Sequence, residues 1–261
     1  MRKVGVRVGG ALRHLRVSRT GVGSEQPVIL LHHGTGSLRS WDLFAPRLPS
    51  VSIAYDRLGF GGSTPLTHTW GASYHTEGAD ELLRLCDALH IERAAIVGHS
   101  DGATIALLAA AAQPSRIEAI VAEAPHVWHG SRHGGDGGFA AFHARYSHDA
   151  RFARAMERDH GPDWRKVYTR WYEWWTSNNG WDVSEVLQRV QCPVLVVHGA
   201  EDIFFPVEHS EHIAAGCARG ELAVIRDAGH EVHREAPDEF ADLALRFLSR
   251  GGRCTTTSAT A

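Results

Sequence analysis

Short apolar runs alternate with helical segments along most of this chain, and that alternation limits its possible folds more than any other feature. Glycines or prolines flank most of the apolar runs, and segments such as 77–89 carry apolar residues at helical spacing. Strands that alternate with helices usually form a parallel sheet covered by helices on both faces. The sequence therefore predicts an α/β fold with a mostly parallel sheet. The predicted strands follow a hairpin of 4–8 and 12–17, and they are 27–32, 51–55, 94–97, 117–122, 193–198 and 222–225.

The alternation breaks after Pro125. The segment 126–190 is polar, rich in His and Arg, and holds six of the eight tryptophans. An insertion this long is more than a simple loop. It is predicted to be a helical lid, or cap, inserted after the sixth strand and resting over the strand ends. The predicted organisation is a core of 1–125 and 191–250, a cap of 126–190, and a flexible tail of 251–261.

Composition excludes several classes of partner. The 261 residues include 27 basic and 30 acidic side chains without a block of like charge, so neither nucleic acid nor a membrane surface is expected as a partner. No run has the length of a signal-peptide core or a transmembrane helix. Four widely spaced cysteines are expected to be free thiols in a reducing cytoplasm. They are Cys86, Cys192, Cys217 and Cys254. Composition leaves monomer and homodimer both open.

The stretch 96–104, IVGHSDGAT, joins a predicted strand to a nearly all-apolar helix of 103–112. This is the strand–turn–helix context of the G-x-S-x-G nucleophile elbow. The turn is sharp, so the residues two before and two after the nucleophile must be small. Those residues are glycines if Ser100 is the nucleophile, but a histidine and an alanine if Asp101 is.

Ser100 is therefore predicted at the tip of the elbow, with Asp101 after it. This excludes chemistry in which a carboxylate attacks, as in haloalkane dehalogenases or epoxide hydrolases. A non-catalytic interpretation also stays open, in which these residues only cap the following helix, because Ser and Asp are favoured as helix N-caps.

A serine nucleophile needs a base of near-neutral pKa and an acid that orients it. His230 follows the predicted strand 222–225 and is the first candidate base, whereas the nearby His233 lies at what looks like a helix start. Asp202 follows strand 193–198 and is the candidate acid. The order Ser100, Asp202, His230 is that of α/β-hydrolases. Adjacent Glu201 would point differently, and Glu123, after strand 117–122, is an alternative acid.

Backbone amides aimed at the developing negative charge should form an oxyanion hole. One is expected at Asp101, the residue after the nucleophile. The other is expected at Thr35, in the loop His32-His-Gly-Thr-Gly36 after the strand residues 28–31. Alternatively, the two glycines of this loop only make a turn.

Taken together, these motifs resemble the α/β-hydrolase superfamily across nearly the whole chain. The residues that carry the resemblance are His33-Gly34, Asp56-Arg-Leu-Gly-Phe-Gly-Gly-Ser63, Gly98–Gly102, Asp202 and His230. The resemblance implies an eight-stranded, mostly parallel sheet, a triad of Ser100, His230 and Asp202, and no cofactor. It does not imply one substrate, since the superfamily includes esterases, lactonases, thioesterases, C–C bond hydrolases and non-catalytic receptors. His32 departs from the commoner single His before the glycine, and either lines the pocket or packs.

The cap is rich in aromatic residues, and Trp171 and Trp175 recur at helical spacing. This face either packs the cap on the core or walls an apolar acyl or aromatic pocket. The residues predicted to line a substrate pocket are His32, His99, Trp128, Trp171 and Trp175. His126, His129 and His133 are not expected to bind metal, because their glycine-rich loop lacks a carboxylate partner.

The preferred hypothesis is a serine hydrolase that cleaves a small-molecule ester or lactone through an acyl-enzyme on Ser100. C–C bond hydrolysis of a vinylogous diketone, or thioester hydrolysis, could use the same triad. The C–C reaction usually needs a basic residue for a substrate carboxylate, and Arg132, Arg145 and Arg170 in the cap are candidates. A ligand-binding receptor on the same fold is a remote alternative, whose mark would be an idle triad.

Overall fold

The computed structural model describes residues 1–23, 26–66, 69–129, 137–146, 148–178 and 180–251. Eight strands form one sheet in the order β1-β2-β4-β3-β5-β6-β7-β8. The β1–β2 and β2–β4 pairs are antiparallel and the remaining pairs are parallel. The prediction of an eight-stranded, mostly parallel sheet is therefore confirmed. The strands are β1 (Arg2–Val8), β2 (Ala11–Thr20), β3 (Val28–Leu31), β4 (Ser52–Tyr55), β5 (Ala94–His99), β6 (Ile117–Glu123), β7 (Val194–Gly199) and β8 (Gly220–Ile225).

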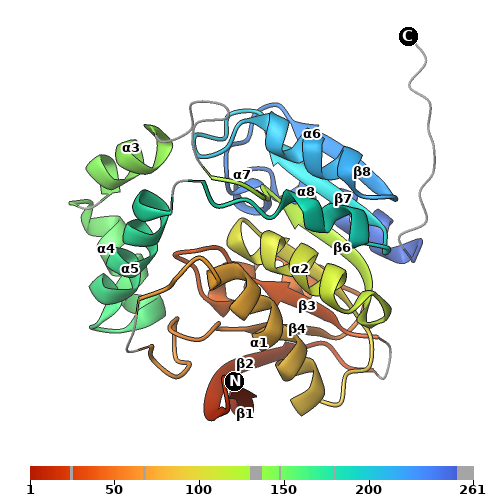
Figure 1. Cartoon of the computed structure of the whole chain (residues 1–261), viewed down its shortest axis with the longest axis horizontal. Helices are drawn as coiled ribbons and strands as arrows, with labels where there is room; N and C mark the ends of the chain where they lie inside the picture. The colour runs from red at the N-terminus through yellow and green to blue at the C-terminus, as the bar shows by residue number, and fades with distance from the viewer. Residues whose placement is uncertain (24–25, 67–68, 130–136, 147, 179, 252–261) are drawn as a thin grey trace.

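Helices lie on both faces of this sheet and past one end of its strands (Figure 1). The α-helices are α1 (Tyr74–Ala88), α2 (Asp101–Ala112), α3 (Gly137–Tyr146), α4 (Ala150–His160), α5 (Trp164–Ser177), α6 (Val207–Gly216), α7 (Val232–Glu235) and α8 (Pro237–Ser249). Short 3₁₀ helices are η1 (Leu38–Trp41), η2 (Ala45–Arg47), η3 (Pro114–Arg116) and η4 (Ser184–Arg189). Helix α1 begins at Tyr74, earlier than the predicted start at residue 77, because its first two side chains are buried rather than solvated.

Two hydrophobic clusters fix the sheet between its helices. One packs α1, α2 and α6 on one face, and α2 is buried on almost every side, as its apolar sequence predicts. The other packs α8 and the η1–η2 segment on the opposite face, through rings such as Trp41, Phe44 and Phe240. Both faces of the central strands are therefore withdrawn from water, which leaves the loops at the strand ends to carry chemistry.

A third cluster is largely aromatic and joins α3, α4 and α5 to the core. We call these three helices the cap helices. They stand together at one end of the sheet, on the left in Figure 1. Trp128, which precedes them in the chain, pairs with Asp182 in an isolated β-bridge. The predicted tail, apart from Gly251, falls outside the described residues, as does His133.

Cys86, Cys192 and Cys217 are free and buried, while Cys254 lies outside the described residues. Burial raises the pKa of each of these three thiols to about 11, 11 and 12 respectively. Within the described part of the chain, no helix is both long and apolar enough to cross a membrane.

Candidate active site

Ser100 lies between β5 and α2 in a backbone conformation that L-residues rarely adopt, with φ 54° and ψ −119°. The turn is as crowded as its sequence predicts. A Cβ atom on Gly98 would lie 2.5 Å from the carbonyl oxygen of Gly102, and one on Gly102 would overlap the carbonyl of Leu31. The unusual backbone conformation of Ser100 costs about 1–3 kcal/mol, and it persists only where the surrounding structure imposes it. The elbow therefore presents Ser100 at its tip.

His230 and Asp202 meet at the same edge of the sheet. The Nδ1 atom of His230 lies 2.7 Å from Oδ2 of Asp202. The other carboxylate oxygen of Asp202 accepts hydrogen bonds from the backbone N–H groups of Phe204 (2.8 Å) and Phe205 (3.2 Å). Both oxygens of Asp202 are thus engaged, and the carboxylate is held in one orientation.

The charges of this pair stabilise each other. Burial disfavours the imidazolium form of His230, but the adjacent carboxylate outweighs burial and raises the pKa of His230. Burial alone would raise the pKa of Asp202, but His230, the backbone N–H of Phe204 and, to a smaller extent, His198 lower it. Asp202 is therefore ionised at neutral pH, and it favours the imidazole tautomer that carries its proton on Nδ1.

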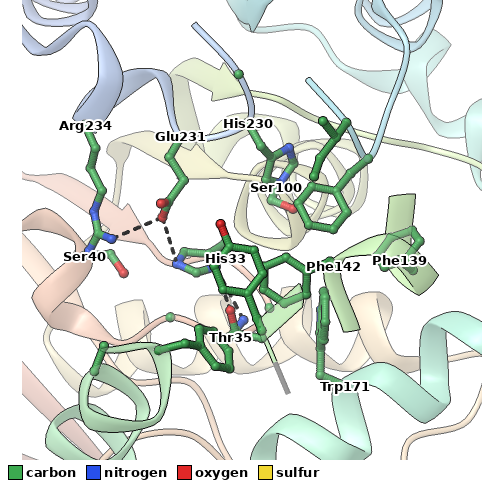
Figure 2. A pocket seen from close by; sticks show the side chains of 18 of the residues that line it. His33, Thr35, Ser40, Ser100, Phe139, Phe142, Trp171, His230, Glu231 and Arg234 are labelled. Carbon is green, nitrogen blue, oxygen red and sulfur yellow. Dashed lines mark hydrogen bonds and ion pairs between the residues drawn. The ribbon is translucent and has the colours of Figure 1, made fainter. Parts of the chain in front are cut away.

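Ser100 and His230 line one cavity of about 340 Å³, and Figure 2 draws both at the same end of it. The loop 33–36 after β3 lines its floor, and the cap helices supply an aromatic wall. Two of the predicted pocket residues, Trp171 and Trp175, belong to that wall. The other aromatic residues of the lining are Phe139, Phe142, Tyr146, Phe152, Phe204 and Phe205.

Three residues predicted to line a pocket lie outside this cavity lining, because each is committed to a buried contact. His32 is fully buried, with Nε2 accepting from the backbone N–H of Arg57 (3.1 Å) and Nδ1 2.7 Å from the carbonyl of His33. His99 is fully buried, with Nε2 2.8 Å from the carbonyl oxygen of His230. Trp128 stacks on His209 with ring centroids 3.9 Å apart. In the structure, therefore, none of these three side chains lines the cavity that holds Ser100.

The two rival assignments of base and acid form a pair of their own. Glu123 accepts hydrogen bonds from Nδ1 (2.8 Å) and from the backbone N–H (2.8 Å) of His233. Both side chains are buried, and neither lines the cavity. His233 lies in helix α7, as its sequence context predicts. The structure therefore brings Asp202, rather than Glu123, to His230.

The side chain of Asp101 faces the interior of the protein rather than the cavity. Its oxygens accept from Tyr74 Oη (2.7 Å) and lie 3.1 Å from His75 Nε2 and 3.3 Å from His126 Nε2. Arg57 lies 3.8 Å away. Burial alone would raise the pKa of Asp101, but the hydrogen bonds from His126 and His75 hold it well below the usual range. This occupied carboxylate is in no position to attack a substrate.

The two backbone N–H groups predicted to form the oxyanion hole, those of Asp101 and Thr35, differ in the hydrogen-bond acceptors near them. Asp101 is the first residue of α2, so its backbone N–H has no acceptor within the helix. The backbone N–H of Thr35 faces Nδ1 of His33 at 3.4 Å, a long hydrogen bond that Figure 2 shows. A bond this weak can be exchanged for one to a negatively charged oxygen. Trp171 closes over this loop, since a Cβ on Gly34 would overlap its indole.

Among the residues that the structure describes, three groups of His and acidic side chains come close enough to hold a metal ion. They are His33, His99 and Glu231; His75, Asp101 and His126; and His99, Glu123 and His233. In each group the carboxylate already accepts hydrogen bonds, Glu231 from Arg234 at 3.2 Å. An ion would have to displace those donors.

The arginines at the cavity differ from those named for the C–C hydrolase alternative. Arg170 donates to the carbonyl of Leu66, and Arg145 stacks on Tyr146; neither side chain lines the cavity. Arg132 lies outside the described residues. Arg158 and Arg234 do line it, and sequence reasoning missed both because no motif marks them.

Comparison with known proteins places the chain in a family. A profile of the alpha/beta hydrolase family matches residues 28–243. The chain belongs to that family, and it is an enzyme, an α/β-fold hydrolase. Serine hydrolase BPHL of Homo sapiens is 28% identical over 263 residues, which cover 93% of this chain and 85% of that protein.

One further protein resembles this chain in sequence, and another resembles it in fold. The putative carbamate hydrolase RutD of Caulobacter sp. (strain K31) is 29% identical over 262 residues, which cover 88% of this chain and 93% of that protein. A thermophilic esterase from Thermogutta terrifontis superposes with a TM-score of 0.78 at 19% identity, covering 97% of this chain and all of that one (100%). This last likeness is one of fold.

Proposed function

We propose that this chain is a serine hydrolase that cleaves a small-molecule ester or lactone through an acyl-enzyme on Ser100. The observation that carries the proposal is the 2.7 Å contact between His230 and Asp202 at a cavity that Ser100 also lines. The relation to a human serine hydrolase supports the reaction class. The cap helices, within the proposed cap of residues 126–190, supply the wall over the reacting atoms.

The proposed reaction begins with attack of the Ser100 hydroxyl oxygen on the substrate carbonyl carbon. His230 takes the hydroxyl proton on Nε2, since Nδ1 is engaged by Asp202. The backbone amides of Thr35 and Asp101 hold the oxyanion. The imidazolium then protonates the departing alkoxide, and water, deprotonated by His230, releases the acid from the ester on Ser100.

A panel of nitrophenyl esters and lactones of graded size tests this proposal. Hydrolysis that saturates with substrate concentration and disappears in the Ser100→Ala variant is the expected result. Background-level rates of the native protein across the panel would count against it. In that case a receptor that binds a small molecule in the same cavity becomes the better account.

The rate is expected to rise with pH as His230 loses its proton, because only the neutral imidazole accepts the proton of Ser100. The carboxylate of Asp202 raises the pKa of His230 despite burial, so the inflection of kcat/KM should lie above the ordinary value of about 6.5. Initial rates at constant ionic strength measure the profile. A flat profile from about pH 5 to pH 8 would contradict the assignment of His230 as the base.

The aromatic wall is proposed to bind an apolar or aromatic acyl group. Trp171→Ala and Trp175→Ala are expected to shift the preference between short and long acyl esters by about tenfold, the usual value of one changed apolar contact. Trp164→Ala is the matched control, because Trp164 lies on the same helix and is also buried, but lies outside the cavity lining. An unchanged chain-length preference in both wall variants would rule out this pocket.

C–C bond hydrolysis of a vinylogous diketone is a second candidate, because Arg158 and Arg234 at the cavity could meet a substrate carboxylate. Both have acidic partners already, Asp159 at 2.7 Å and Glu231 at 3.2 Å. A direct assay with such a diketone discriminates the two reactions. Turnover of the diketone well above that of any ester would favour this candidate.

A further inference from the structure

One cap side chain reaches past the substrate cavity to the loop that carries a proposed oxyanion donor. His160 is the last residue of α4, and its ring is buried. Its Nε2 atom lies 3.0 Å from the carbonyl oxygen of Thr35. Its Nδ1 atom lies 2.9 Å from the backbone nitrogen of Gly61, in the turn after β4.

These two contacts determine the tautomer of the ring. The backbone N–H of Gly61 can only donate, so Nδ1 of His160 must be the acceptor. The proton of a neutral ring is then on Nε2, where it is donated to the carbonyl of Thr35. Burial lowers the pKa of His160 and favours this neutral form, although the hydrogen bond to the carbonyl of Thr35 and the charges of Asp159 and Asp56 oppose burial. The positive charge of Arg16 acts in the same direction as burial.

The part of the loop before Thr35 is held by hydrogen bonds to the carbonyl oxygen of His33. The carbonyl of His33 accepts from Gly36 N–H (3.1 Å) and from a guanidinium nitrogen of Arg57 (3.2 Å). This holds the chain before Thr35, whereas the bond from His160 holds the chain after it. The two restraints together limit rotation about the backbone of Thr35, and with it the direction of its N–H.

We propose that His160 is a positioning residue, which ties cap helix α4 to the oxyanion loop and so aims the N–H of Thr35. The proposal rests on the proposed function, because it assumes that Thr35 stabilises an oxyanion. The cap would then have two roles, because it would line the cavity and also orient an oxyanion donor. Since the effect is confined to the transition state, its loss should lower kcat more than it raises KM.

Substitution of His160 by asparagine or by glutamine tests its contacts with Gly61 and with Thr35 separately. In His160→Asn the shorter side chain can still accept from Gly61 but does not reach Thr35. In His160→Gln the longer side chain can place its amide N–H where Nε2 stood. The matched control is His143→Gln, because His143 also lies in the cap and contacts a partner, Tyr168 Oη at 3.0 Å, away from the loop.

For His160→Asn, we expect kcat to fall about tenfold to a hundredfold, the scale of a misplaced donor, with KM within about twofold. His160→Gln should recover most of that loss, and His143→Gln should match the native protein. Affinity for a trifluoromethyl ketone, whose adduct with serine carries an oxyanion, should fall in parallel with kcat/KM.

Native-like kcat in His160→Asn would overturn the proposal, as would a rise in KM at unchanged kcat, because the cap would then only bind substrate. An equal loss in the Asn and Gln variants with unchanged ketone affinity would also overturn it. If the native protein itself neither turns over esters nor binds the ketone, the proposed function fails instead. Thermal unfolding of each variant checks that the cap remains folded.

Discussion

Ser100→Ala is expected to reduce turnover by about a millionfold, the loss typical of a serine hydrolase without its nucleophile. Ser100→Gly should be equally inactive, but more stable. Alanine keeps the strain of φ 54°, whereas glycine adopts this conformation freely. Relief of that strain should stabilise the glycine variant over the alanine variant by about 1 kcal/mol, or about 2–4 °C in Tm.

Hydrolysis rates and thermal unfolding of the two variants measure both effects. Equal stability of the glycine and alanine variants would mean that the elbow is unstrained. Residual turnover near the native rate in either variant would remove Ser100 from the chemistry altogether. The pair therefore separates the backbone conformation of the elbow from the reactivity of its side chain.

Asp202→Asn is expected to lower kcat by about ten-thousandfold, although the shape of the side chain is unchanged. The backbone N–H groups of Phe204 and Phe205 both donate to Oδ1 of Asp202, so the amide oxygen of asparagine must take that place. Its NH₂ group then faces His230 and requires Nδ1 to be an acceptor. The ring proton moves to Nε2, where it blocks acceptance of the proton from Ser100.

Steady-state kinetics of Asp202→Asn measure this loss, with Asp227→Asn as the control. Asp227 precedes His230 in the same loop and is exposed, so its substitution should leave kcat unchanged. A loss of less than about tenfold in Asp202→Asn would contradict the assigned role of the carboxylate.

The sequence predicts the elbow well because the constraint there is local. Gly98 and Gly102 crowd a single turn, and no distant segment is needed to see that Ser100 stands at its tip. Asp202 and His230 could also be predicted, because both follow strands of a parallel sheet and such strand ends meet at one edge. The order of the three residues along the chain then indicated which one is the acid and which one is the base.

The environment of Asp101 could not be predicted in the same way. Its partners His75 and His126 come from α1 and from the segment after β6, and their positions depend on how those elements pack. His99 is likewise predicted to line the pocket, but its Nε2 atom lies 2.8 Å from the carbonyl oxygen of His230 and its side chain is fully buried. Whether a histidine faces a cavity or packs behind it is decided by tertiary contacts.

The most direct test of a reactive Ser100 is the intact mass of the protein after treatment with a fluorophosphonate, with Ser100→Ala as the control. We expect one adduct on the native protein and none on the variant, because only a serine activated by His230 attacks phosphorus rapidly. A native protein that remains unlabelled would show that Ser100 is not activated, and equal labelling of the Ser100→Ala variant would place the reactive group elsewhere.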